Sequence, residues 1–325
     1  MFMNSADKTI MPSRLVLDSP LELVEHVEDL LGEAHGFGSF LFDTNGQIVV
    51  DNGITWLYTT SLTGNKWESW SRSFDLRTMK TGPAWRVLVS EPEDRRGAVL
   101  HHVIRVAPDL VVGFFSGGTG VLAATATAPN AKFKRDDTFR INPVQGWETH
   151  GEEPEGWVLE ANGAFVKIRE DMDSVVFWQG YDSYLATRLL GDLAWAKIRI
   201  DKKTRRISLE ERHPENPLPF RDPSWSCARC GGNLSSNVRI DGRYVFFYYF
   251  RPLNSSDAYI ALALCGEPLF LTDTEHFLVD HMRGQEEVAE KFQVIQQENE
   301  LLVFSENRLK DKSWRTGMRR FLVVR

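Results

Sequence analysis

The chain of 325 residues is poor in cysteine, in positive charge and in long apolar runs, and each shortage excludes a class of protein. Three cysteines are too few for a disulfide scaffold. The C-x-x-C pair Cys227 and Cys230 lacks the second ligand pair of a structural zinc site, so reduced thiols are expected, with a metal or redox role as the minor alternative. We therefore expect neither a metal nor a cofactor.

The charge balance is mildly acidic, with a formal net charge of -7. A basic stripe, which binding to a phosphate backbone requires, is missing, so nucleic acid is not an expected partner. The sequence contains no apolar run of bilayer-spanning length, and its first residues lack the apolar core of a secretory signal. These features predict a cytoplasmic protein without a membrane partner.

Several catalytic motifs are also missing. The sequence has no Gly-rich phosphate loop, no nucleophile elbow and no H-E-x-x-H metal motif. Their absence disfavours phosphoryl transfer, serine hydrolysis and zincin chemistry.

Residues 19–32 carry the strongest helix signal. Ser19 is a good N-cap, Pro20 suits the first helical position, and Glu22 completes a capping box. Gly32 can end the helix. We predict a short N-terminal helix that plugs or flanks a β-domain.

After the predicted helix, the chain repeats one pattern five times: a polar turn, an apolar and aromatic strand, and a strand with small residues. The turns recur roughly every 55 to 70 residues, which fits four-stranded blades with long insertions. We predict an all-β fold, a single five-bladed β-propeller with a short N-terminal helix. Residues 13–32 supply that helix and an outer strand at 13–18 that closes the ring with the last blade; the blades lie at approximately 36–90, 91–145, 150–215, 220–275 and 285–325.

The stretch 241–251, "DGRYVFFYYFR", is the clearest copy of the repeat. A strand that is apolar on both faces is typical of a sheet sandwiched between two other layers. Stacked blades provide that environment, so we predict an interior blade strand with no binding role of its own. Small residues of third strands, such as Ala123, Ala124 and Ala126, would complement the bulky rings.

The order and spacing of residues from Asp43 to Leu76, with "DGRYVFFYYF…AYIALAL" later, resemble those of the five-bladed β-propeller glycosidases. These include arabinanases, β-xylosidases, invertases and their relatives. The resemblance implies a small substrate in a funnel at one end of the central channel. It also implies one carboxylate from the innermost strand of each of several blades: a base or nucleophile, a pKa-modulating Asp and a Glu acid. An oxocarbenium-like transition state needs one acid kept protonated and one carboxylate kept ionised.

By this resemblance, Asp43 is the expected base or nucleophile, because it lies about eight residues before its turn; an Asx-type turn at a strand end is the alternative. Glu160, on the inner strand of the third blade, is the expected acid. Its neighbour Trp157 would raise the pKa of Glu160 by desolvation. Trp157 and Trp178 are also candidates to contact substrate.

Two blades depart from the family pattern. In the second, His101 and His102 stand where a carboxylate is expected, and strand alternation lets only one of them face the channel. The pair is either structural, or the histidine that faces the channel is an acid/base group or a metal ligand. In the fourth, Asn233 and Ser235 can orient a ligand but cannot donate a proton at pH 7. Asp222, in "FRDPSW", resembles an invertase motif but lies out of register.

Three functions remain open. The first is a glycoside hydrolase-like enzyme that uses Asp43 and Glu160 on a sugar substrate. The second is a cyclase, isomerase or pericyclase of natural-product biosynthesis, which would hold an apolar substrate with His101, His102 or Asn233. The third is a carbohydrate-binding propeller without chemistry. The partner in each case is a small molecule.

Overall fold

The computed structural model describes most of the chain as β-strands joined by turns. The described residues are 15–16, 19–30, 40–42, 54–94, 97–116, 120–142, 165–167, 173–185, 188–212, 214, 232–250, 257–265, 274–282, 286–311 and 313–324. Among these residues there is no helix, and none of the described segments could cross a membrane as a helix.

The strands that the structure describes form five sheets. The first sheet contains β3 (Phe40–Phe42), β4 (Thr55–Thr63), β5 (Lys66–Asp75) and β6 (Lys80–Leu88). The second contains β7 (Val99–Ala107), β8 (Leu110–Ser116), β9 (Val121–Ala126) and β10 (Lys134–Ile141). The third contains β11 (Phe165–Lys167), β12 (Asp173–Leu185), β13 (Arg188–Ile200) and β14 (Ile207–Arg212).

The last two sheets each take in a strand from the N-terminal part of the chain. The fourth contains β15 (Gly232–Ile240), β16 (Arg243–Phe250), β17 (Tyr259–Cys265) and β18 (Thr274–His281), with β1 (Leu15–Val16) at its edge. The fifth contains β19 (Glu286–Gln297), β20 (Glu300–Leu309) and β21 (Trp314–Val323), with β2 (Leu21–Val27) at its edge.

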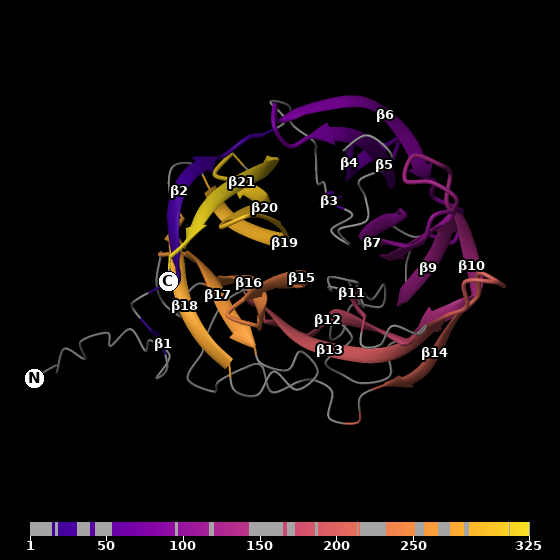
Figure 1. Cartoon of the computed structure of the whole chain (residues 1–325). Coiled ribbons are helices and arrows are strands. Elements are labelled where there is room, and N and C mark those ends of the chain that lie inside the picture. The colour runs from indigo at the N-terminus through magenta and orange to yellow at the C-terminus, as the bar shows by residue number, and fades with distance from the viewer. Residues whose placement is uncertain are drawn as a thin grey trace, which may run out of the picture.

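The sheets stand around a central axis as an all-β propeller (Figure 1). Strands β3, β7, β11, β15 and β19 lie nearest the axis, and each forms the inner edge of its sheet. Each runs antiparallel to the second strand of its sheet. We call the end of a sheet where its innermost strand begins the head end, and the end where that strand leads to the second strand the turn end.

The "DG" turn is a tight hairpin, as its sequence predicts. Asp241 and Gly242 have φ angles of 49° and 77°, the left-handed conformation that a type I′ turn requires at both central positions. Gly242 has open space around a hypothetical Cβ, so it is favoured by its backbone conformation and not by crowding. The turn fixes the register of β15 against β16.

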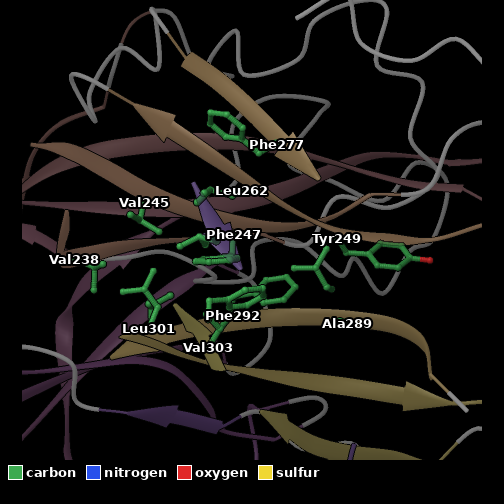
Figure 2. Close-up of a cluster of buried hydrophobic side chains, with 14 of the residues drawn as sticks. Val238, Val245, Phe247, Tyr249, Leu262, Phe277, Ala289, Phe292, Leu301 and Val303 are labelled. Carbon is green, nitrogen blue, oxygen red and sulfur yellow. The ribbon is translucent and has the colours of Figure 1, made fainter. Parts of the chain in front are cut away.

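Strand β16 is buried on both faces, which confirms the prediction from its aromatic run. Val245, Phe247 and Tyr249 face the fifth sheet, where the Phe247 ring lies 6.3 Å from Phe292 and 5.9 Å from Phe321 between centroids (Figure 2). On the opposite face the Tyr248 hydroxyl lies 3.1 Å from Nδ1 of His276, also in the fourth sheet. Both faces of this strand are therefore used for packing.

The predicted helix at 19–32 is wrong where the structure describes it. Residues Leu21–Val27 form β2, which pairs antiparallel with β21 from Leu21 opposite Val323 to Val27 opposite Met318. The capping signals are local, whereas β21 would otherwise be an unpaired edge with its backbone groups exposed. Pairing along a whole strand outweighs the weak helix propensity of a single turn.

The predicted ring-closing strand at 13–18 is also corrected. Leu15 and Val16 pair in parallel with His276 and Phe277 of β18, in the fourth sheet and not in the last. Strand β2 joins the N-terminal segment to the last sheet instead. The N-terminal segment therefore joins the two last sheets.

Candidate functional site

Buried polar side chains gather at the head ends of the first, second, fourth and fifth sheets. Toward the turn ends most buried residues are apolar, for example Ile200, Ile207, Ile240 and Leu301, although His276 is buried near the turn end of β18. Buried polar groups are costly unless they are hydrogen-bonded, so their collection at one end marks that end as the candidate site. The group comprises Thr59, Thr60, Glu68, Ser69, Ser71, His101, His102, Asp280, Glu286, Ser305, Glu306, Asn307 and Thr316.

The two histidines lie near the start of β7, the innermost strand of the second sheet. His101 is 3% exposed and His102 is 4% exposed. The register shifts between Leu100 and His102, so a β-bulge at His101 interrupts the simple alternation assumed from the sequence. Burial lowers the pKa of His102 to about 3. His102 is therefore a neutral imidazole near pH 7.

The amide and hydroxyl candidates of the fourth sheet lie on its innermost strand. Asn233 is on β15 opposite Phe247, and Ser235 follows in a stretch where the register shifts between Leu234 and Arg239. Trp178 lies on β12 opposite Ala194. Only the backbone of these three candidate residues is described.

Four other candidates lie outside the described residues: Asp43, Trp157, Glu160 and Asp222. The chain places Asp43 immediately after β3, and Glu160 five residues before β11 begins at Phe165. Asp43 and Glu160 are thus each close in sequence to an innermost strand. That they meet across a funnel stays a prediction, and Cys227 and Cys230 likewise lie outside the described part.

Sequence reasoning missed a buried ionic cluster between the fourth and fifth sheets. Arg319 on β21 donates from Nε to Asp280 Oδ2 at 2.8 Å and from a terminal nitrogen to Glu286 Oε2 at 2.5 Å. All three side chains have no exposed surface. The other carboxylate oxygen of Glu286 accepts from Asn307 Nδ2 and from His26 Nε2, the latter at 3.1 Å.

No short motif could have revealed this cluster. The separations in sequence from Glu286 are 33 residues to Arg319, 21 to Asn307 and 260 to His26. The available signal was only that a strand begins with a glutamate, which is commonplace. The folded sheets bring these partners together.

A further buried carboxylate, Glu68, lies at the head end of the first sheet. Burial opposes its ionisation, but hydrogen bonds from Arg86, Thr63 and Ser90 outweigh burial and lower the pKa of Glu68. Glu68 is therefore ionised near pH 7. Within the described ranges, no group of three or more His, Cys, Asp or Glu side chains is arranged to hold a metal ion.

The comparisons with known proteins concern the fold. No family model and no curated protein matches the sequence. The solved structure of BT0996 in a complex with RGII has a TM-score of 0.60 at 12% identity, over 92% of this chain and 92% of that protein. A levansucrase variant complexed with sucrose has a TM-score of 0.59 at 8% identity, over 93% of this chain and 86% of that protein.

The catalytic domain of a Coprinopsis cinerea GH62 α-L-arabinofuranosidase has a TM-score of 0.51 at 10% identity, over 83% of this chain and 87% of that domain. The chain thus has the β-propeller fold found in glycoside hydrolases, which confirms the all-β propeller architecture, though not the number of blades, that the sequence resemblance implies. Identities this low carry no residue assignments.

Proposed function

We propose that the protein is a glycoside-processing enzyme whose site lies in the central funnel lined by the innermost strands, with each sheet acting as one blade of a single five-bladed domain. The observation that carries the proposal is the gathering of buried polar side chains at the head ends. Asp43 and Glu160 are the proposed carboxylate pair on the strength of the sequence resemblance; Glu160 precedes β11 on the head-end side, whereas Asp43 follows β3 on the turn-end side. The fold shared with a sucrose-bound levansucrase is consistent with a sugar substrate.

In this proposal the two carboxyl groups have opposite tasks. Asp43 stays ionised and acts as the base or nucleophile, while Glu160, desolvated beside Trp157, stays protonated and donates to the leaving group. A separation of about 5 to 10 Å between them covers both retaining and inverting chemistry. Asn233 and Ser235 on β15 orient sugar hydroxyls, and the aromatic rings stack on the sugar.

The test is turnover of a panel of aryl glycosides and oligosaccharides containing arabinose, xylose, fructose and glucose. D43N and E160Q each lower kcat by about 10²- to 10⁴-fold on any substrate the wild type cleaves. D201N is the matched control, because Asp201 lies in an exposed turn between β13 and β14, where its carboxylate accepts hydrogen bonds from the nearby residues Lys203 and Thr204. Unchanged kcat in both D43N and E160Q would falsify the assignment of the pair.

A second candidate function is favoured by the buried, neutral His102. A neutral imidazole at the head of an innermost strand can donate or accept a hydrogen bond without carrying charge into an apolar pocket. This suits a cyclase, isomerase or pericyclase that acts on an apolar natural product. The discriminating assay incubates the protein with polyene or quinone-methide probes and compares wild type with H101Q and H102Q. Product formation that survives D43N and E160Q but not H102Q supports this function over hydrolysis.

A further inference from the structure

The N-terminal strands cross the junction between the fourth and fifth sheets. Strand β1 pairs with β18 at the edge of the fourth sheet, and β2 pairs with β21 at the edge of the fifth. Figure 1 shows both strands on the outside of the ring, far in sequence from the strands they pair with. We call residues 19–27, which contain β2, the strap.

The strap has an apolar anchor at one end. Leu21 is 5% exposed and packs in the cluster that contains Phe247, Phe292 and Phe321, drawn in part in Figure 2. Its amide is held by Ser19 Oγ at 3.1 Å. The middle of the strap is less tightly held, because the register against β21 shifts between Leu23 and Glu25 and Val24 is 50% exposed.

The other end of the strap has a polar anchor. His26 Nε2 bonds Glu286 Oε1 at 3.1 Å, with 16% of the His26 side chain and none of the Glu286 side chain exposed. Glu286 is the first residue of β19, so the carboxylate joins the strap to the head of an innermost strand. Asn307 bonds the same oxygen and is fixed in turn by Ser305, whose hydroxyl donates to Asn307 Oδ1.

The space beside Asn307 is kept free by a glycine. A Cβ on Gly317 would lie 2.0 Å from Asn307 Nδ2 and 3.3 Å from the carbonyl oxygen of Val27 in the strap. Since Gly317 has an ordinary φ angle, this close approach, not its backbone conformation, requires glycine here. The strap, β21 and the Asn307 side chain thus fit together as one unit around Glu286.

We propose that the strap is a conformational device: its docking orders the head of β19, and its release loosens that strand. Strand β19 borders β15, which carries Asn233, and also β3, after which Asp43 follows. Docking of the N-terminal segment on the outside of the ring therefore controls the shape of the funnel at its centre. The inference does not depend on which chemistry occurs in the funnel.

The test is hydrogen–deuterium exchange on the full chain with wild type, H26A, H26Q and E25A. H26A removes the polar anchor, so the amides of residues 288–290 exchange about tenfold faster, together with those of β2, while amides of β8 and β9 keep their wild-type rates. H26Q keeps a donor toward Glu286 and restores most of the protection. E25A is the matched control, because Glu25 is on the strap but pairs with Arg320 at 3.0 Å in a partly exposed contact.

Two results overturn the proposal. One is faster exchange of β2 in H26A with residues 288–290 unchanged; the other is an equal effect of E25A and H26A on residues 288–290. Should H26A fail to fold, wild type in low urea decides the question. There, we expect the amides of β2 and of residues 288–290 to exchange together, before those in the interiors of β20 and β21. If residues 288–290 stay protected until the whole chain unfolds, the proposed role of the strap is wrong.

Discussion

Two buried regions at the head end solve the same physical problem differently. Between the fourth and fifth sheets, Arg319 is fully buried and is paired with two buried carboxylates, Asp280 and Glu286. On β7, His102 is also buried but avoids a buried charge by staying neutral, with its pKa lowered to about 3. The first region keeps its buried charges because each is paired with an opposite charge. The second region holds a neutral histidine, and burial makes its protonation unfavourable.

A third region, around Arg135, contains an ion pair that is less deeply buried than the one at Arg319. Arg135 on β10 bonds Asp94 Oδ1 at 2.9 Å and the carbonyl of Val89 at 2.9 Å, and lies 5.0 Å from the centroid of the Phe115 ring. Its side chain is 12% exposed, and its other partner, Glu91, is 47% exposed. An ion pair that water partly reaches therefore holds the connection between β6 and β7 against β10 of the second sheet.

The largest effect is expected where no water can replace a lost partner. R319M leaves two buried carboxylates without their guanidinium, which lowers the free energy of unfolding by about 3 to 5 kcal/mol. Urea unfolding followed by tryptophan fluorescence measures it. Adding D280N and E286Q to R319M recovers part of the loss, and an equally unstable triple variant would mean that packing rather than charge dominates.

The next effect concerns pH and His102. Because the folded pKa is about 3 and the unfolded value about 6.5, the unfolded chain binds the extra proton first as pH falls. Above about pH 6.5 both states hold His102 neutral and no stability is lost. As the pH falls toward 3 the free energy of unfolding decreases, and the loss is about 2 kcal/mol at pH 5. Unfolding measured from pH 7 to pH 5 in wild type and H102Q checks this, since H102Q loses that part of the slope. Parallel profiles would refute a protonation penalty at His102.

A smaller loss is expected at the partly exposed pair. R135A lowers the free energy of unfolding by about 1 to 2 kcal/mol, because Asp94 stays buried but the loop beside it can admit water. A double-mutant cycle with D94N isolates the coupling between the two side chains. A coupling as large as that between Arg319 and Glu286 would remove the distinction drawn between the two junctions.

The smallest effect is expected at a surface pair. Arg205 lies 2.5 Å from Asp109, but their side chains are 42% and 71% exposed. D109N changes the free energy of unfolding by only about 0 to 1 kcal/mol, and 0.5 M salt removes most of the difference. A loss above that range would show that burial is not what separates these ion pairs.

Much of the strand pattern could be predicted because its causes are local. The run from Tyr244 to Phe250 is apolar on both faces and follows a type I′ turn, so it specifies an interior strand and its register without reference to the rest of the chain. The helix at 19–32 was mispredicted for the same reason. Its capping residues are local signals, but the backbone of 21–27 takes its partner from the far end of the chain.

The candidate site was predicted less completely. Strand position placed His101, His102 and Asn233 on innermost strands, and the structure agrees for each backbone. The bulge at His101 could not be predicted, since it depends on how β7 fits against β8. The pairing of Asp43 with Glu160 lies outside the described residues and stays a prediction.

By itself, the sequence determined the all-β class, the repeated strands and their turns, because side-chain alternation and turn residues act over a few positions. Only the tertiary structure decided which edge the N-terminal segment joins and which charges are buried together. Glu286, Arg319 and His26 are ordinary surface residue types in sequence. Their burial is stable only because strands distant in the chain bring a donor to both carboxylate oxygens of Glu286, and no local pattern encodes that.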